Sequence, residues 1–239
     1  MIAKSRRWPC RLLIASVALL VATATVTQVY ALTLFDAEFI CPIGGEKFTA
    51  KAVGSYSQFG MRLDFKPLGA LIAPIPLPVC PQNGFVMYKS EFTETELDKL
   101  KPLVLSDEYR RNRAENTDYY MVAYLRERMG ADSLELGFLY LKASWEAEDK
   151  PTTLTSYRSF AFAKFDEFLM RDKSQSQQWW TAAIAAAELE RLLGHFEAVE
   201  VRLAKLPKSD AGPMRLQMID QIRGYAHQRD ADVHKLMKN

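Results

Sequence analysis

The sequence of 239 residues predicts an α+β fold that is mostly α-helical, with a small β module over residues 32–92 and a helical domain over residues 93–239. Before about residue 90, strand-like segments surround two similar turns, Cys-Pro-Ile-Gly-Gly at 41–45 and Cys-Pro-Gln-Asn-Gly at 80–84. After residue 90, nearly every segment repeats apolar residues at helical spacing. A run of strands followed by a run of helices is typical of the α+β class.

The two turns look like the halves of a degenerate zinc ribbon. An intact half is Cys-Pro-x-Cys-Gly, in which two thiolates on one tight turn bind one side of a tetrahedral ion. Here Gly44 and Asn83 stand where the second cysteine of each half is expected. Two thiolates fill only two of the four positions on zinc, and no histidine or further cysteine is near in the sequence. We therefore expect no structural zinc, and no cofactor is expected elsewhere.

The remaining cysteines, Cys41 and Cys80, are predicted to form a disulfide. If the ribbon geometry is kept without metal, their sulfur atoms face each other, since two ligands of one zinc ion lie roughly 4 Å apart. A small backbone adjustment then allows a bridge with the usual Cβ separation of about 4 Å. The alternative is two unpaired, buried thiols. An oxidising compartment favours the bridge.

The first 31 residues have the order of a secretory signal peptide: four basic residues, an apolar run over 12–24, and a small-residue pattern ending at Ala31. Cleavage there would start the mature protein at Leu32 and remove Cys10, leaving two cysteines for one bridge. We therefore expect a periplasmic or secreted protein. The alternative is that residues 12–34, about the length that spans a bilayer, are retained as a membrane anchor with the body outside the cytoplasm.

The charge balance argues against a nucleic-acid partner. The chain carries 31 Lys plus Arg and 29 Asp plus Glu, and without its first 31 residues it carries 27 basic and 29 acidic residues. A nucleic-acid-binding protein has a basic surplus or a basic stripe, so no nucleic-acid partner is expected.

Three strands are predicted in the β module. Residues 34–40 alternate apolar and polar side chains and enter the first turn, and residues 48–53 form a second candidate strand. Residues 54–79 contain four prolines and several glycines, so no helix is expected there, only a loop or an irregular edge. Residues 85–89 are predicted to form the strand that leaves the second turn.

The helical domain is predicted to begin at Thr93, which forms a capping box with Glu96. Three helices with apolar stripes follow, and a fourth over residues 178–193 is apolar on more than one side and should be buried. The stripes are Met121, Tyr124, Leu125 and Met129; Leu134, Phe138, Leu141 and Trp145; and Tyr157, Ala161, Phe165 and Phe168.

The later helices are predicted to pair as tetratricopeptide-like antiparallel hairpins. After the buried helix, Gly194 supplies a turn, and a shorter helix ending at Pro207 places its aromatic and apolar residues where that repeat has them. Residues 134–149 and 155–172 form a looser copy. A terminal helix from Pro213 is expected to cap the stack, with Ile219, Ile222 and Ala226 directed inward.

A set of short motifs in this order carries a family resemblance: Cys41-Pro42, Phe48, Asp64-Phe65, Val79-Cys80-Pro81, Gly84 and the stretch 137–145. With these motifs, residues 35–206 resemble the bacterial family called domain of unknown function 2225. The resemblance implies a Cys-Pro-x-Cys ribbon followed by tetratricopeptide-like helices, and it implies no particular reaction. The chain departs from the family pattern at Gly44 and Asn83 and in its secretory signal.

Two groups of side chains in the helical part are candidate sites. His227, Asp230 and His234 fall at helical spacing on one face and can hold a metal ion, but a solvated terminal helix gives the same pattern. Trp179 and Trp180 can form a ligand platform, but inclusion of one ring in the helical core is favoured.

Repeat-like helices without a catalytic set predict a non-enzymatic, exported interaction protein whose concave helical side binds a protein or peptide. Neither a Gly-rich phosphate loop nor a nucleophile elbow is present. The alternative is a metal-binding protein or an enzyme that uses the loop region and the late histidines His195, His227 and His234. A membrane partner is expected only if the signal segment is retained as an anchor.

Overall fold

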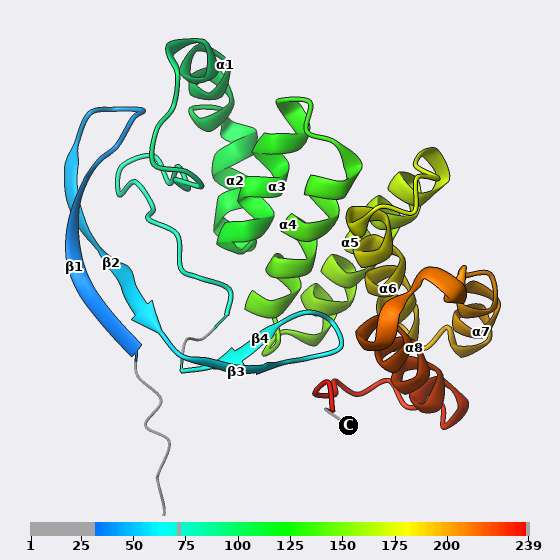
Figure 1. Ribbon diagram of the computed structural model, residues 1–239. Helices are drawn as coiled ribbons and strands as arrows, with labels where there is room; N and C mark the ends of the chain where they lie inside the picture. Colours follow the sequence, from blue (N-terminus) through cyan, green and yellow to red (C-terminus); the bar gives the residue numbers. More distant parts are fainter. Residues whose placement is uncertain (1–31, 71–72, 238–239) are drawn as a thin grey trace, which may run out of the picture.

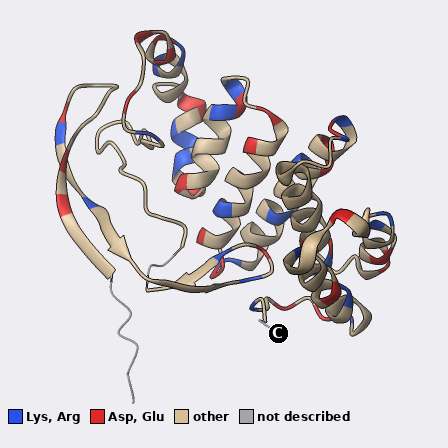
Figure 2. Ribbon diagram, in the orientation of Figure 1, with Lys and Arg blue, Asp and Glu red and all other residues tan. Residues whose placement is uncertain are grey.

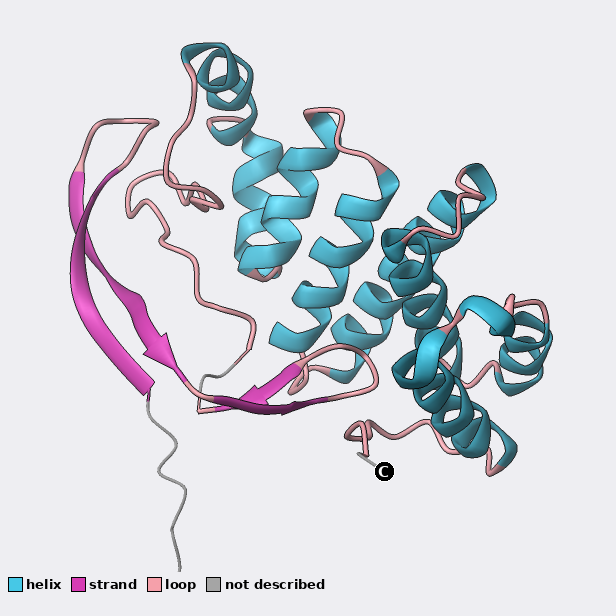
Figure 3. Cartoon of the chain, in the orientation of Figure 1, coloured by secondary structure: helices cyan, strands magenta, loops and turns pink. Residues whose placement is uncertain are grey.

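A computed structural model describes residues 32–70 and 73–237 of the chain (Figure 1). In this part of the chain, eight α-helices follow two small antiparallel β-hairpins, and the strands lie to one side of the helices (Figure 3). The mostly helical α+β class is therefore confirmed. The expected signal peptide lies outside the described residues. Within the described ranges, no helix combines the length and the apolar character needed to cross a bilayer.

The first hairpin pairs β1 (Leu32–Ile40) with β2 (Lys47–Tyr56), so both strands predicted here are present and are longer than expected. Near the turn, Phe39 lies opposite Phe48, and the two rings stack with their centroids 5.7 Å apart. Leu34 and Phe35, further from the turn, are about half exposed. Only the turn end of this hairpin is therefore held against the helices.

The second hairpin pairs β3 (Gln58–Met61) with β4 (Pro67–Gly69), inside the segment predicted to be a loop or irregular edge. The described residues of that segment form no helix, as predicted. The prediction of a strand over 85–89 is wrong, since a single bridge joins Val79 to Val86. The physical reason is that Pro76 and Pro78 have no backbone N–H group to extend a ladder beyond that bridge.

Helix α1 begins at the predicted capping box. The Thr93 N–H group donates to Glu96 Oε2 at 2.8 Å, and the Glu96 N–H group donates back to Thr93 Oγ1 at 3.3 Å. The helices are α1 (Glu94–Val104), α2 (Asp107–Glu115), α3 (Asp118–Arg128), α4 (Ser133–Glu146), α5 (Pro151–Arg171), α6 (Gln177–Leu192), α7 (Phe196–Ala204) and α8 (Gly212–His227).

Helix α6 is the centre of the helical part, and twelve of its sixteen residues are buried, as predicted. It turns into α7 at Gly194, whose φ of +81° lies in the region that glycine adopts without strain. Helices α4 and α5 pack closely because Gly137 has no side chain. A Cβ atom there would lie 2.8 Å from the Phe165 ring. The predicted inward residues of α8, Ile219 and Ile222 among them, are also buried.

The described residues of the β module form no hydrophobic core of their own. Cys41, Cys80 and Phe85 belong to one buried cluster together with Leu100 of α1 and Leu125 of α3. This core crosses the boundary expected near residue 92. The two disulfide-joined turns are therefore packed as part of the helical body.

The C-terminal segment after α8 is hydrogen-bonded to the second hairpin. The Leu63 N–H group, at the tip of the second hairpin, donates to His234 O at 3.0 Å, and the Leu236 N–H group donates to Met61 O at 2.8 Å. The buried Arg191 of α6 donates to the carbonyl of Asp230 at 2.6 Å. The second hairpin, helix α6 and the C-terminal segment thus form one connected unit.

Candidate functional site

The two cysteine turns have the same backbone hydrogen bonds, as their similar sequences predict. In each turn the cysteine N–H group donates to the carbonyl five residues on, and the glycine N–H group four residues on donates back to the cysteine carbonyl, all at 2.9 Å. The two glycines, Gly45 and Gly84, have φ values of +80° and +71°. Both turns therefore need glycine at this position.

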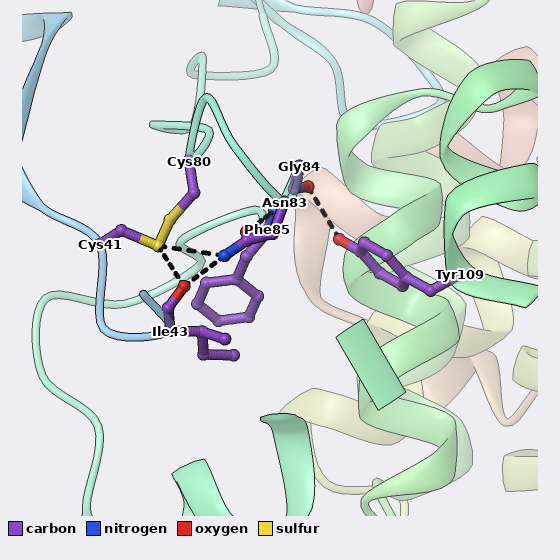
Figure 4. The surroundings of a disulfide bond; sticks show 7 residues. All are labelled: Cys41, Ile43, Cys80, Asn83, Gly84, Phe85 and Tyr109. Carbon is purple, nitrogen blue, oxygen red and sulfur yellow. Dashed lines mark hydrogen bonds between the residues drawn. A yellow bond between two sulfur atoms is a disulfide. The ribbon is translucent and has the colours of Figure 1, made fainter. Parts of the chain in front are cut away.

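Cys41 and Cys80 lie at disulfide distance, with Sγ atoms 2.11 Å and Cα atoms 5.5 Å apart (Figure 4). The two residues are 1% and 0% exposed. The arrangement is the one that the sequence predicts for a bridge between the two turns. Because both residues are buried, the pair is placed to hold the two turns together.

Asn83, which stands where the fourth ribbon cysteine is expected, also joins the two turns. Its Nδ2 group donates to the Ile43 carbonyl of the first turn, and its Oδ1 atom accepts from the Phe85 N–H group of the second at 2.9 Å (Figure 4). The hydroxyl of Tyr109 on α2 donates to the Gly84 carbonyl at 2.9 Å, and burial raises the pKa of Tyr109 to about 12. The second turn is thereby fastened to the helices.

Sequence reasoning missed Glu46, the residue after the two glycines of the first turn. Both of its carboxylate oxygens are buried, with an accessible area below 1 Å² each, and neither has a hydrogen-bond partner. Its carboxylate and the sulfur atoms of Cys41 and Cys80 all lie within 4.8 Å of one another. Among the residues that the structure describes, this is the one group of three or more potential His, Cys, Asp or Glu ligands.

The late histidines do not form a site together. Helix α8 ends at His227, so the expectation that His227, Asp230 and His234 share one helical face is wrong. His227 Nε2 lies 2.9 Å from a carboxylate oxygen of Glu200, whereas His234 Nε2 lies 2.8 Å from Asp230 Oδ2. His195 is exposed at the beginning of α7. The three rings thus have separate surroundings.

A groove of about 650 Å³ lies between α5, α6 and α7. Met170 and Val201, which line it, are 68% and 55% exposed. Trp179 also lines the groove, whereas the Trp180 ring is buried in the core, so the expected inclusion of one ring in the core is confirmed. The groove therefore presents apolar side chains that no described part of the chain covers. A second groove of about 620 Å³ runs between β2 and residues 75–78 and 87–90.

The charges around the α5–α7 groove are unevenly paired. Arg202 binds Glu190 at 2.8 Å and Asp166 at 2.9 Å, so this cluster of one cation and two carboxylates keeps one net negative charge. Glu197, also on the lining, binds Arg229 at 2.5 Å. Lys173 and Lys205 line the groove and have no ion-pair partner among the described carboxylates. Elsewhere basic and acidic residues are interspersed along the helices (Figure 2). The groove thus has an apolar floor with two lysines that lack an ion-pair partner among the described residues and a separate Arg202 cluster that carries one excess carboxylate.

Fold and site together define a mostly helical α+β protein in which two joined cysteine turns pack against α1–α3 and an apolar groove lies separately between α5, α6 and α7. No family model matches the chain, and neither a curated protein nor a solved structure matches it. The resemblance to the family called domain of unknown function 2225 therefore rests on the short motifs alone.

Proposed function

We propose that this chain is a non-enzymatic interaction protein of an exported compartment, and that its α5–α7 groove binds a peptide segment of a partner protein. The observation that carries the proposal is the exposure of Met170 and Val201 in a groove of about 650 Å³. Exposed apolar side chains gathered in one concave surface are typical of a recognition site. We also propose that α4 pairs with α5, and α6 with α7, as tetratricopeptide-like hairpins.

The charges suggest the chemistry of the partner. Lys173 and Lys205 have no ion-pair partner among the described residues, although Lys173 Nζ donates to the Leu169 carbonyl, whereas the carboxylates of Asp166 and Glu190 share Arg202. An apolar segment with acidic residues at one end therefore fits the groove better than a basic segment. Contacts with apolar side chains would supply most of the affinity, and the two lysines would set the direction of the bound segment.

The joined cysteines support the compartment, because disulfides form and persist in oxidising environments outside the cytoplasm. The alternative function, a metal-binding protein or enzyme that uses the late histidines, has weaker support. His227 and His234 belong to different local networks, and His195 is at the surface. No described carboxylate or cysteine completes a group of three ligands around any of them.

The test is a selection of peptides from a random displayed library on the purified protein, followed by fluorescence anisotropy with the selected peptides. We expect apolar peptides with an acidic end. Val201→Glu places a charge on the apolar floor and should weaken binding at least about tenfold, as the loss of a central contact typically costs more than 1 kcal/mol. Lys205→Glu should weaken acidic peptides and spare neutral ones.

The matched control is Leu105→Glu, which changes a side chain of similar exposure, 51%, at the end of α1. It should leave binding unchanged. Selected peptides that bind the Val201→Glu variant as tightly as the original protein would refute the groove as the site. A selection that returns no binder, or only basic peptides, would also contradict the proposal.

A further inference from the structure

The Glu46 carboxylate is the least satisfied charged group beside the two cysteines. Its two oxygens are buried and accept no hydrogen bond, although ionised carboxylates in such surroundings normally find a donor or a cation. No lysine or arginine forms an ion pair with it in the described part of the chain. The group next to it is the sulfur pair of Cys41 and Cys80.

The position of this carboxylate is specific. A Cβ atom on Gly44 would lie 2.4 Å from Glu46 Oε2, so the carboxylate occupies the space in which a side chain at position 44 would begin. Position 44 is where the sequence of the first turn lacks its second cysteine. Glu46 therefore brings an anionic oxygen to the place left by that missing ligand, opposite the Asn83 side chain, which bridges the turns.

We propose that reduction of the Cys41–Cys80 disulfide converts this cluster into a zinc site, with the two thiolates and the Glu46 carboxylate as ligands and water in the fourth position. Two thiolates select zinc over magnesium or calcium, and carboxylate oxygen is an accepted third ligand of zinc. Opening the bridge lets the sulfur atoms move to the separation of roughly 4 Å that two ligands of one zinc ion require.

A dithiol or a phosphine supplies the two electrons that open the disulfide. The phosphine takes oxygen from water and becomes a phosphine oxide, and the two protons of that water go to the sulfur atoms. A dithiol gives two electrons and two protons to the disulfide, forms its own disulfide and leaves two thiols on Cys41 and Cys80. Binding of Zn²⁺ then releases the two thiol protons. The two turns are thus held by a covalent bond in oxidising conditions and by a metal ion in reducing conditions, and the hydrogen bonds of Asn83 serve both states.

The experiment uses the chain with Cys10→Ala, so that Cys41 and Cys80 supply the only thiols. The protein is reduced with a water-soluble phosphine and titrated with Co²⁺, whose absorption reports tetrahedral thiolate ligation, and then with Zn²⁺ in competition. We expect one equivalent of metal bound by the reduced protein and none by the oxidised protein. Glu46→Gln should weaken binding at least about tenfold, the lower end of what changes around a metal site cost.

Glu38→Gln, which changes an exposed carboxylate on β1, is the matched control and should bind as the parent does. Glu46→His supplies a neutral nitrogen ligand of similar reach and should restore binding, which a merely structural role of Glu46 would not predict. Far-UV circular dichroism of each reduced variant shows whether the fold is kept. Absence of Co²⁺ binding by the folded, reduced parent, or equal affinity of the folded Glu46→Gln variant, would overturn the proposal.

Discussion

Removal of the bridge between Cys41 and Cys80 should cost a large part of the stability of the protein. The two cysteines are 39 positions apart, and closing a loop of that length stabilises by about 4 kcal/mol on the chain-entropy model. Domains of this kind are stable by about 5–15 kcal/mol in total. We expect Cys41→Ala/Cys80→Ala to lose about 3–4 kcal/mol. Alanine is the better replacement because a serine hydroxyl would be buried at either position without an assured partner.

The buried cluster that the cysteines share with α1–α3 predicts where stability is lost when the bridge is removed. Because Leu100 of α1 and Leu125 of α3 pack in the same cluster as the two cysteines, loosening of the turns should extend to α1–α3. Helices α4–α8, whose buried residues belong mostly to other clusters, should stay folded. Urea unfolding followed by far-UV circular dichroism measures the total loss, and amide hydrogen exchange locates it.

Reduction of the original protein, in the presence of a metal chelator, provides a control that removes the bridge and keeps the sulfur atoms. It should reproduce most of the loss seen in the double alanine variant. A loss below about 1 kcal/mol in both samples, or uniform loss of exchange protection through α8, would refute the reasoning from loop closure and the shared core. Two free thiols in the unreduced, unfolded protein would show that the bridge does not form.

Three further predictions concern the helical body. Burial raises the pKa of Glu146 from 4.5 to about 7, so the unfolded chain releases this proton at lower pH than the folded protein does, and stability should fall by up to about 3 kcal/mol as the pH rises from 4.5 to 7. The urea concentration at the unfolding midpoint should change less with pH in Glu146→Gln than in the original protein. The same pH dependence in both proteins would contradict the assignment. Gly137→Ala should lower the midpoint temperature of thermal unfolding, because the new Cβ would overlap the buried Phe165 ring at a cost of about 1–3 kcal/mol, which exceeds the gain from the higher helix propensity of alanine. An unchanged midpoint would show that the ring can move. Arg191→Leu should cost about 3–5 kcal/mol by leaving the buried Glu188 unpaired, and Arg191→Leu/Glu188→Leu should recover part of that loss in the same unfolding assay.

Local patterns predicted most of the helices correctly because their signals lie within a few residues. The Thr93 capping box and the apolar surroundings of α6 are examples. The bridge was predictable because the two turns repeat one sequence pattern. The second hairpin was missed since its strands are short and its pairing is completed by the C-terminal segment. The strand expected after Cys80 was wrong because the prolines that limit it belong to the opposite segment.

The candidate sites were harder to predict than the fold. In the sequence, Glu46 is one acidic residue among many, and such residues usually lie in solvent. Only the turn geometry shows that its carboxylate lies over Gly44. Met170 and Val201 belong to different helices, and no local pattern says that they line one groove. Both sites depend on how distant segments pack, which spacing along the chain does not encode.

The contact between the second hairpin and the C-terminal segment determines when this part of the protein can fold during synthesis. Leu63 is fully buried against residues of α6 and α8, and its backbone partner is His234, near the other end of the chain. A chain that emerges from a ribosome or a translocation channel with its N-terminus first presents this leucine long before its partner exists. The backbone hydrogen bonds between this hairpin and residues 234–236 can therefore form only after those residues have been made, and until then the hairpin is open to aggregation or to a chaperone.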